Sequence, residues 1–490
     1  MINVYLHNNE GVIKGLPADL AQRISDECSF EIKGAQHSEL YKKGRWDGRK
    51  RLFNKQSGTF PMGLWGRIRQ ILLESQCEVT IHDKRTDAWD DLLDIRLSES
   101  VEERPYQIEA VQKAIQARRS VLQVATGGGK TVIASRLISE LRCPTIFFVH
   151  TKDLLYQAKS SFEAMLEGSD VSVIGQVGDG VVDVQPVTVA TMQTVSKFLG
   201  VKYEKNAYDD AKDDEKQVDI TSANSQAVRA MIDKAQLIIW DEVHRVACNT
   251  AYGISTAINN APYRVGLSAS PWRDDGADIM IEASMGPIVY KLSASDLIEQ
   301  KYLVPPIIRR VKVPSSIPWY LDTRTYEQIY RDEIVNNEYR NQLILKYAMD
   351  FMDLGIPTLI LVQQIKHGKK LQKLISENYH PVEFLSGRDL TYKRNLTIEE
   401  MRRGERICLI ATTIADEGLD IKRLAGIILA GGGKSSTRAL QRIGRVLRPF
   451  PGKTHALVVD FDDEALYLRD HSAERKRIYQ TEPKFMILEV

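Results

Sequence analysis

A glycine-rich loop between an apolar run and a helical pattern constrains the fold of this chain more than any other stretch. Residues 121–125 are mostly apolar, Gly127, Gly128 and Gly129 follow, and Lys130 then opens a helical pattern. Glycine lacks a Cβ, so the loop can turn tightly and point several backbone N–H groups at one anion. The N-terminus of the helix adds about half a positive charge there. The stretch therefore predicts a strand, a phosphate-binding loop and a helix.

The residues of this loop fit the phosphates of a nucleotide. We expect Thr126 and the three glycines to surround the phosphates, and Lys130 to reach the β- and γ-phosphates. The Thr131 hydroxyl is expected to ligate Mg²⁺ beside them. The alternative is an ordinary strand-to-helix turn with an incidental lysine, which the flanking apolar pattern makes the weaker interpretation.

The composition indicates a globular protein of about three domains, since domains average about 150 residues. The chain has 490 residues, 43% hydrophobic and 27% charged, and its net charge of +1 excludes a uniformly basic nucleic-acid coat but not a localised basic track. The absence of a basic segment followed by a long apolar one predicts a cytoplasmic protein without membrane spans. Widely spaced cysteines predict reduced thiols and neither zinc nor disulfides: Cys28, Cys77, Cys143, Cys248 and Cys408.

Residues 1–98 differ from the rest in their pattern of apolar residues, which predicts a small α+β module. Short alternating apolar runs read as strands, and residues 16–28 and 64–76 read as helices. A basic stretch with nearby aromatic residues lies between them, and this mixture suits nucleic acid because cations neutralise phosphates and aromatic rings stack on bases. The alternative is a solvated hairpin whose aromatic residues belong to a core. The residues expected to contact DNA here are Lys42, Lys43, Arg45, Trp46, Arg49, Arg51 and Trp65.

Two adjacent carboxylates end an apolar strand at residues 237–240. Such a buried parallel strand places Asp241 and Glu242 at the carboxyl edge of a sheet, where α/β proteins bind ligands. Asp241 is expected to hold Mg²⁺ through water, and Glu242 to polarise an attacking water. The acidic insert at 202–224 is interpreted as a solvent-exposed segment with a short helix and no catalytic role.

A second α/β block begins near residue 305. Its strands, at 358–362, 407–411 and 426–430, precede a helix in which Arg445 and Arg448 project from one face. Two arginines so placed could clamp a phosphate presented by another domain, whereas the alternative is a solvated basic helix.

Taken in order, the segments RPYQ, ATGGGKT, VHTKDLLYQ, TMQT, DEVH, SASP, TTIADEGLD and QRIGRVLR resemble the motif series of superfamily 2 helicases and translocases. The resemblance covers about residues 104–448 and implies an α/β fold with two tandem RecA-like parallel-sheet domains, ATP in their cleft and a nucleic-acid strand across both. With the front module, the expected domains are 1–98, 99–300 and 301–490.

The front segments YKKGRWDGRKRLF and FPMGLWGRIRQIL are similar to those of phage branch-migration DNA helicases. This resemblance implies an ATP-hydrolysing enzyme that remodels forks and four-way junctions in phage replication, recombination or repair, within the host cytoplasm. It favours 3′ to 5′ movement along DNA, including single-stranded DNA. We expect a monomer with no membrane partner.

The resemblance also assigns roles to residues. Tyr106, Gln107, Gly418 and Asp420 would bind the nucleotide, with Gln107 reading adenine, and Gln441, Arg445 and Arg448 would close on the γ-phosphate. His244, Ser268 and Ser270 would couple the ATP state to DNA. The DNA backbone would lie near Thr151, Lys152, Thr191, Gln193, Thr412 and Thr413.

Three other functions stay open at this point. One is a double-strand DNA translocase subunit of a restriction-type complex, although no nuclease constellation is visible. Another is a nucleotide-switched DNA-binding protein in which hydrolysis is incidental. An RNA unwinder is less favoured, because the second motif reads DEVH rather than DEAD and the last begins with Gln441 rather than histidine.

Overall fold

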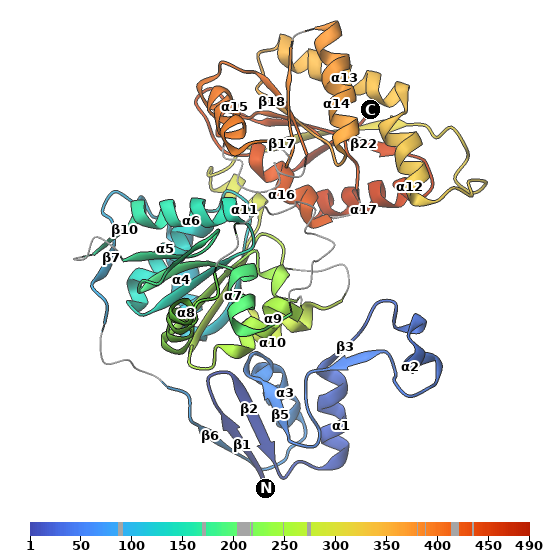
Figure 1. Ribbon diagram of the computed structural model, residues 1–490. Coiled ribbons are helices and arrows are strands. Elements are labelled where there is room, and N and C mark those ends of the chain that lie inside the picture. The colour runs from blue at the N-terminus through green and yellow to red at the C-terminus, as the bar shows by residue number, and fades with distance from the viewer. Residues whose placement is uncertain are drawn as a thin grey trace. The chain divides into compact units, whose positions relative to one another are not determined.

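The computed structural model describes residues 1–86, 92–168, 173–202, 216, 219–247, 249–271, 276–379, 381–387, 389–412, 421–433 and 436–490. These residues form two compact units (Figure 1). The first unit contains the front module, whose strands and helices lie within residues 1–83, and a parallel-sheet lobe that we call lobe 1. The second unit, lobe 2, contains the rest of the chain from residue 292 together with residues 125–128.

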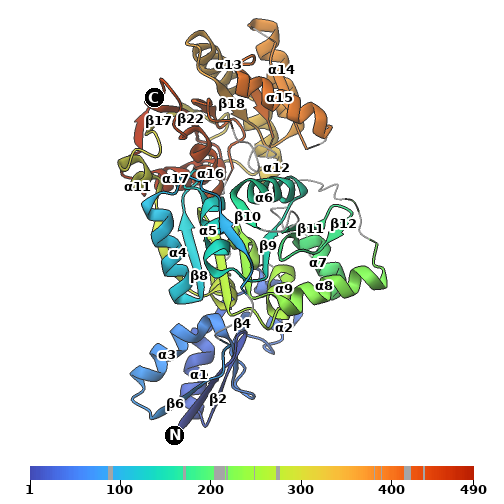
Figure 2. The ribbon, with the colours of Figure 1, turned by 90° about the vertical axis from the view of Figure 1, so that its left-hand side faces the viewer.

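The front module is a small α+β fold. Its sheet has the order β5-β2-β1-β6, with β1 antiparallel to β2 and parallel to β6. Alternate residues of β1 are buried, as the sequence period of two requires. Figure 2 shows helices α1 and α3 alongside this sheet. The elements are β1 Ile2–Leu6, β2 Glu10–Lys14, α1 Ala18–Glu27, β5 Thr59–Pro61, α3 Trp65–Glu74 and β6 Val79–Asp83.

A two-stranded ribbon extends from this module and carries the basic stretch. Strand β3 (Ser29–Glu31) pairs antiparallel with β4 (Arg49–Arg51), and the short helix α2 (Glu39–Lys42) lies in the connection between them. We call residues 29–51 the arm.

Lobe 1 is built on an eight-stranded sheet of order β12-β11-β13-β9-β14-β15-β8-β16. Strands β11, β13, β9, β14, β15 and β8 run parallel, and every residue of β9 and β13 is buried. The strands are β8 Arg119–Val124, β9 Thr145–Val149, β11 Ile174–Gly178, β12 Val181–Asp183, β13 Val187–Thr191, β14 Leu237–Asp241, β15 Tyr263–Ser268 and β16 Ile288–Leu292, with β7 Ile95–Leu97 and β10 Leu166–Gly168 paired separately. The helices are α4 Pro105–Ala117, α5 Lys130–Leu141, α6 Lys152–Met165, α7 Met192–Leu199, α8 Ser222–Lys234, α9 Asn249–Ala257 and α10 Asp278–Met285.

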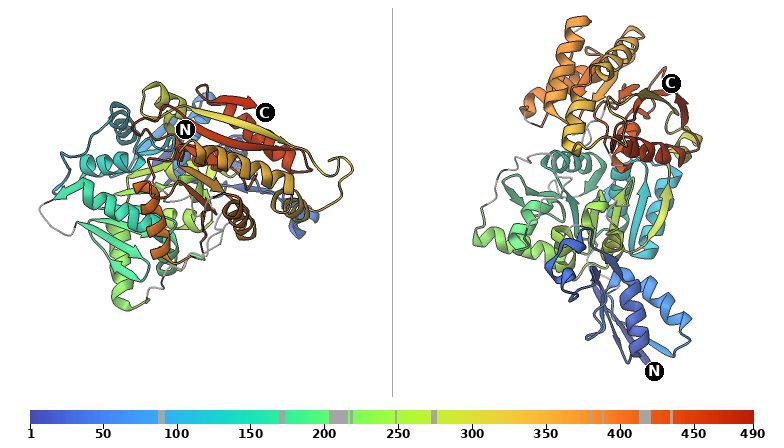
Figure 3. Two further views of the ribbon diagram at one scale, coloured as in Figure 1. Left: turned by 90° about the horizontal axis from the view of Figure 1, so that it is seen from above. Right: turned by 90° about the vertical axis from the view of Figure 1, so that its right-hand side faces the viewer.

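Lobe 2 is built on a seven-stranded sheet of order β19-β20-β18-β21-β22-β17-β23, whose paired strands run parallel. Its strands are β17 Pro306–Val313, β18 Thr358–Leu361, β19 Glu383–Leu385, β20 Cys408–Ala411, β21 Gly426–Ile428, β22 Ala456–Asp463 and β23 Met486–Glu489. Its helices are α11 Ala294–Glu299, α12 Tyr326–Ile329, α13 Glu338–Asp353, α14 Ile365–Asn378, α15 Thr391–Arg403, α16 Ser436–Val446 and α17 Leu468–Gln480, with a π-helical turn at Tyr330–Val335. Helices flank the sheet within each lobe (Figure 3).

This architecture confirms the predicted fold class of two parallel-sheet domains with a small α+β front module. In parallel sheets the loops after the strands gather at one edge. The predicted site residues that follow β8, β9, β13, β14 and β15 therefore share one edge of lobe 1.

Candidate active site and nucleic-acid contacts

The glycine loop after β8 has the backbone that its sequence predicts. Gly127 and Gly129 have φ angles of 87° and 78°, a region that side chains with a Cβ rarely occupy. The Gly128 N–H donates to the Ala125 carbonyl at 2.9 Å, and Gly129 caps helix α5. A Cβ on Gly129 would lie 2.3 Å from Nε2 of Gln107. The backbone conformation thus favours glycine at position 129, and a larger residue there would also displace the Gln107 amide.

Side chains from three elements of lobe 1 meet around Glu242. Lys130, the first residue of α5, donates from Nζ to Glu242 Oε1 at 2.7 Å. Ser268, at the end of β15, donates from Oγ to Glu242 Oε2 at 3.0 Å. The His244 Nδ1 atom lies 3.5 Å from the same Oε2 and 3.4 Å from Ser268 Oγ. The structure therefore brings together four residues that lie up to 138 positions apart in the sequence: two predicted to act at the nucleotide and two predicted to couple its state to DNA.

The electrostatics of this cluster keep Glu242 ionised at neutral pH. Burial alone would raise the pKa of Glu242, but the Lys130 ammonium and the neighbouring donors outweigh it and lower that pKa. Burial lowers the pKa of His244 to about 4, so its imidazole is neutral. Asp241 behaves in the opposite way, since burial dominates and raises its pKa. The Glu242 carboxylate is therefore a charged hydrogen-bond acceptor beside the Lys130 ammonium.

The backbone at Glu242 is strained in a way that helps to place its carboxylate. Glu242 has a φ of 51°, and its N–H donates to Asp241 Oδ1 at 3.1 Å. A residue with a Cβ enters this left-handed region at a cost and usually for a functional reason. The turn directly after β14 thus sets adjacent carboxylates in different environments.

The two residues predicted to bind adenine lie on α4. Tyr106 and Gln107 are both buried, and Gln107 Oε1 accepts the Arg104 N–H at 2.8 Å. Arg104 also donates to the Tyr106 hydroxyl at 2.9 Å. Gln107 packs against the phosphate loop at Gly129, which places it next to the nucleotide site. Recognition of adenine by this pair stays a prediction.

Two predicted DNA contacts are helix caps on neighbouring strands. Thr151 accepts from the Leu154 N–H at 3.3 Å to cap α6, and Thr191 accepts from the Thr194 N–H at 3.4 Å to cap α7. The preceding strands β9 and β13 pair directly, so these two helix N-termini begin at the same edge. Lys152 and Gln193 lie in the first turns of α6 and α7. Helix N-termini bind anions, which suits phosphates of a nucleic-acid backbone.

The predicted residues of lobe 2 are placed in part. Gln441 and Arg445 lie on α16 and Arg448 just after it, all three partly buried, and burial lowers the pKa of Arg448. Thr412 follows β20 and is buried. In lobe 1, the Ser270 N–H donates to Ser268 Oγ at 3.2 Å. Three further predicted residues, Thr413, Gly418 and Asp420, lie outside the described residues.

Several cations of the arm form ion pairs that hold the ribbon. Arg51 contacts Asp47 at 2.6 Å and lowers the pKa of that carboxyl to about 2. Arg49 donates to Ser29 Oγ at 2.9 Å and contacts Glu31 at 3.3 Å across the ribbon. These arginines therefore have a structural role whatever else they bind.

The other predicted residues of the arm divide into exposed cations and partly buried aromatics. Lys42 and Arg45 are exposed, and Lys43 pairs with Glu39 at 2.9 Å on the surface. The Trp46 indole donates to the Arg49 carbonyl at 2.8 Å. Trp65 stacks against buried Phe60 with ring centroids 6.2 Å apart and packs on the module core. Trp65 thus has the core position that the alternative interpretation gave it.

Sequence reasoning missed how the front module attaches to lobe 1. Lys50 reaches Asn249 at 3.1 Å, Arg67 pairs with Glu282 at 2.7 Å, and Asn9 donates to the Thr256 carbonyl at 2.7 Å. A Cβ on Gly63 would lie 2.0 Å from the Glu282 carbonyl oxygen. Spacing in the sequence gives no signal of such contacts, which join residues about 200 positions apart.

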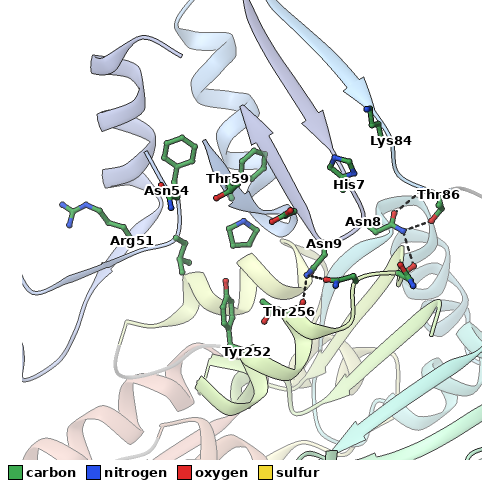
Figure 4. Close-up of a pocket in the computed structure, with 17 residues that line it drawn as sticks. His7, Asn8, Asn9, Arg51, Asn54, Thr59, Lys84, Thr86, Tyr252 and Thr256 are labelled. Atoms are coloured by element: carbon green, nitrogen blue, oxygen red, sulfur yellow. Dashed lines mark hydrogen bonds between the residues drawn. The ribbon is translucent and has the colours of Figure 1, made fainter. Parts of the chain in front are cut away.

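An open pocket of about 920 Å³ lies at this junction (Figure 4). Asparagine, threonine and tyrosine side chains from both parts line it, including Asn8, Asn54, Thr59 and Tyr252. The module and lobe 1 therefore present a shared polar surface.

Within the described ranges, no helix is long and apolar enough to cross a membrane. Among the same residues, no group of three or more histidine, cysteine, aspartate or glutamate side chains could hold a metal ion. A Mg²⁺ ion bound with nucleotide needs only one or two protein ligands, because the phosphates supply others.

Two family models match the chain. The model "Type III restriction enzyme, res subunit" matches residues 100–273, and "Helicase conserved C-terminal domain" matches residues 343–449. The described residues of the first range lie within lobe 1 apart from residues 125–128, and the second range lies within lobe 2.

Curated relatives extend this similarity. The chain is 26% identical to "ATP-dependent DNA helicase uvsW" of Enterobacteria phage T4, over 98% of this chain and 93% of that protein. It is 25% identical to "DNA 3′-5′ translocase XPB2" of Sulfurisphaera tokodaii, over 78% of this chain and 85% of that protein.

A solved structure supports the fold. The fragment of a putative HsdR subunit of a type I restriction enzyme from Vibrio vulnificus is 18% identical, with a TM-score of 0.56 over 79% of this chain and 68% of that one. The glycine loop with its lysine, the paired carboxylates and the two family models agree with one another. They identify the chain as a superfamily 2 helicase that is similar to the ATP-dependent DNA helicase of phage T4.

Proposed function

We propose that this helicase remodels branched DNA, namely forks and four-way junctions, by ATP-driven branch migration and unwinding in the cytoplasm. The observation that carries the proposal is the extent of the similarity to the T4 protein, which covers 98% of this chain. The family models begin only at residue 100, so the similarity includes the front module that they leave out. A module built onto the motor lobe can hold a junction while the motor moves one strand.

The cluster around Glu242 supports a role in ATP hydrolysis. The Glu242 carboxylate is ionised and held by Lys130 and Ser268, so it can accept a proton from an attacking water. Lys130 Nζ, within 2.7 Å of this carboxylate, can donate to the β- and γ-phosphates of ATP. His244, neutral and next to both Glu242 and Ser268, can report the state of the nucleotide to the rest of the lobe.

Thr131 and Asp241 fit a bound Mg²⁺. Both offer hard oxygen donors, a hydroxyl on the first turn of α5 and a partly buried carboxylate at the end of β14. When bound, the ion would neutralise charge that develops on the phosphates. Asp241 would also orient Glu242 through the hydrogen bond from the Glu242 N–H.

Gln441, Arg445 and Arg448 would act on the γ-phosphate from the second lobe. Arginines are suited to this because a guanidinium stays charged even when partly buried. ATP held by both lobes would favour a closed arrangement, and hydrolysis would release it. The strand contacts near Thr151 and Thr191 in lobe 1 would then move relative to the contact near Thr412 in lobe 2.

Branch migration is a suitable task for such a motor. Each step breaks and forms one base pair, so the stacking loss of about 1.4 kcal/mol per pair in plain unwinding is nearly balanced. ATP would then serve mainly to give direction. We propose 3′ to 5′ movement, the direction in the name of the Sulfurisphaera relative, and a monomeric motor.

A gel assay tests this proposal. The wild type and Glu242→Gln are incubated with ATP and a fork, a four-way junction or a tailed duplex of equal length. We expect wild type to process the fork and junction faster than the duplex, and Glu242→Gln to bind all three without processing them. Equal rates on all three substrates would refute the branched-DNA preference.

A double-strand translocase is the second candidate, and the "res subunit" model and the HsdR-like fold favour it. Such a motor would displace a third strand from a triplex without separating the duplex. Triplex displacement together with inactivity on the four-way junction would support this candidate instead.

A further inference from the structure

A tight turn in lobe 2 displays two large aromatic side chains to solvent. Trp319 is 47% exposed and Tyr320 69% exposed, and both lie in the loop between β17 and α12. The Leu321 N–H donates to the Pro318 carbonyl at 2.9 Å, so the two rings occupy the tip of a β-turn. Clustered exposed aromatic side chains mark interaction sites, because a bound partner would remove their apolar surface from water.

Buried ion pairs hold the base of this loop. Arg324 contacts Asp322 at 2.7 Å and Glu333 at 2.8 Å, and the carboxylate side chains are 0% and 5% exposed. Ser316 bonds to the same Glu333. Hydrogen bonds to Asp322 and Glu333 raise the pKa of Arg324. The tip is thus carried on an ordered support.

The two rings stand beside a cation. The Arg469 guanidinium lies 4.1 Å from the centroid of the Trp319 ring, and the Trp319 and Tyr320 rings are edge-to-face at 5.7 Å. An aromatic face with an adjacent arginine matches a nucleotide, since the ring stacks on a base and the cation meets a phosphate.

The position of the turn in the sheet favours a nucleic-acid strand as its occupant. The loop follows β17, whose carboxyl end shares an edge with that of β20, and β20 leads to Thr412. Four strand spacings of about 4.8 Å separate β20 from β17 in the sheet order, roughly 19 Å. In Figure 1 the loop between β17 and α12 extends beyond the helices of its lobe. One strand of DNA can therefore span this edge.

We infer that Trp319 and Tyr320 form a base-stacking element that receives an unpaired base of the DNA on which the motor acts. The inference deepens the proposed function and rests on it for the identity of the strand as DNA. Stacking at this point would hold a separated strand after the base pair opens. A protein partner would also suit exposed aromatics, and the test below separates the two.

Fluorescence supplies the direct test. Oligothymidylate is added to the full-length wild type and to Trp319→Phe, and quenching of tryptophan emission is measured. We expect the fractional quench to be smaller in Trp319→Phe, because a stacked base quenches the ring that this change removes. We also expect Trp319→Ala/Tyr320→Ala to bind the oligonucleotide about 5- to 150-fold more weakly.

A fork assay supplies the functional test, with a matched control on the opposite edge of the sheet. Phe450 is also exposed and lies 5.6 Å from an arginine, Arg423, in the loop before β22. We expect the double variant to lose fork displacement, whereas Phe450→Ala keeps it. ATP hydrolysis without DNA should be unchanged in the double variant.

The outcomes separate the two proposals. The inference would be overturned if Trp319→Phe were quenched as much as wild type and if the double variant bound the oligonucleotide and displaced the fork strand like wild type. The same result is expected if the turn binds a protein. A reduced quench and weaker binding in a protein that processes no branched DNA would support the stacking element and refute the proposed function.

Discussion

The two parallel sheets use the carboxyl ends of their strands in different ways. In lobe 1, Glu242 after β14 is 19% exposed and bonds to Lys130, which was predicted to bind phosphate, and to Ser268, which was predicted to couple the ATP state to DNA. In lobe 2, the carboxylate at the end of β22 is Asp463, which is 4% exposed and contacts the fully buried Arg340 at 2.8 Å. A carboxylate at the same kind of position is thus open to chemistry in one sheet and closed in the other.

A second buried pair in lobe 2 follows the same rule. Asp460, within β22, is fully buried and contacts Arg475 of α17 at 2.9 Å. Buried ion pairs of this kind specify packing, while partly exposed carboxylates near a lysine are available to a ligand. This difference is consistent with the proposal that lobe 1 carries the hydrolytic residues and lobe 2 supplies arginines and strand contacts.

The largest effect is expected from removing an arginine of lobe 2. Arg445→Ala should lower ATP turnover by about 10³- to 10⁵-fold with little change in ATP affinity, because an arginine finger acts on charge in the transition state. Steady-state kinetics with saturating DNA measure this, with Arg445→Lys as the charge-conserving control. A rise in KM with unchanged kcat would limit lobe 2 to nucleotide binding.

A smaller loss is expected at the carboxylate of lobe 1. Glu242→Gln should reduce turnover by about 10²- to 10⁴-fold, since an amide cannot accept the proton of the attacking water. ATP binding, followed with a fluorescent analogue, should persist. Wild-type turnover in this variant would show that Glu242 is no more needed for hydrolysis than the buried carboxylates of lobe 2.

The buried arginine of lobe 2 should matter for stability. Arg340→Ala leaves Asp463 buried without its partner and should lower the free energy of unfolding of the lobe by about 3–5 kcal/mol. Urea unfolding measures this. Arg331→Ala, which removes an exposed arginine paired with Asp332, should change stability by less than about 0.5 kcal/mol. Equal effects of the two changes would show that burial of the pair is unimportant.

The pH dependence sharpens the account of lobe 1. The pKa of Glu242 is lowered, so its carboxylate stays ionised until the pH falls well below the ordinary range of glutamate. Ser268→Ala removes a donor to that carboxylate and should raise its pKa, which moves the acid limb of the kcat profile to higher pH. An unmoved acid limb would mean that another group limits turnover in acid.

The smallest effect concerns the arm. Because Arg49 and Arg51 hold the ribbon through ion pairs, neutralising Lys42, Lys43 and Arg45 is the cleaner test. The triple variant should flatten the log–log salt dependence of fork binding by up to about 0.9 per lost phosphate contact.

Lys113→Ala is the control for this variant, because Lys113 forms an i, i+4 pair with Glu109 much as Lys43 does with Glu39. An identical salt slope in wild type and the triple variant would leave the arm without a role in DNA binding.

The sequence predicted the parts of the site that follow from local pattern. The glycine loop, the strand before Asp241 and the series of motifs could be identified because each combines a local period with polar residues at a strand end or on a helix. The fold class followed from the same alternation of strands and helices. The roles assigned to individual site residues stay predictions.

Long-range packing could not be predicted in this way. The pair of Arg340 with Asp463 joins residues 123 positions apart, and the close approach of Gly63 to Glu282 joins residues far apart in the chain. The exposure of Trp319 depends on the support around Arg324, which has no local signature. Such contacts depend on which faces meet after folding.

The measurement that tests the central claim most directly compares two four-way junctions. One junction has homologous arms, so branch migration forms a base pair for each pair broken, and the other has heterologous arms, so net pairs are lost. We expect wild type with ATP to resolve the homologous junction at a clearly higher rate than the heterologous one, and Glu242→Gln to resolve neither. Equal rates on both junctions, or resolution without ATP hydrolysis, would contradict the proposed branch migration.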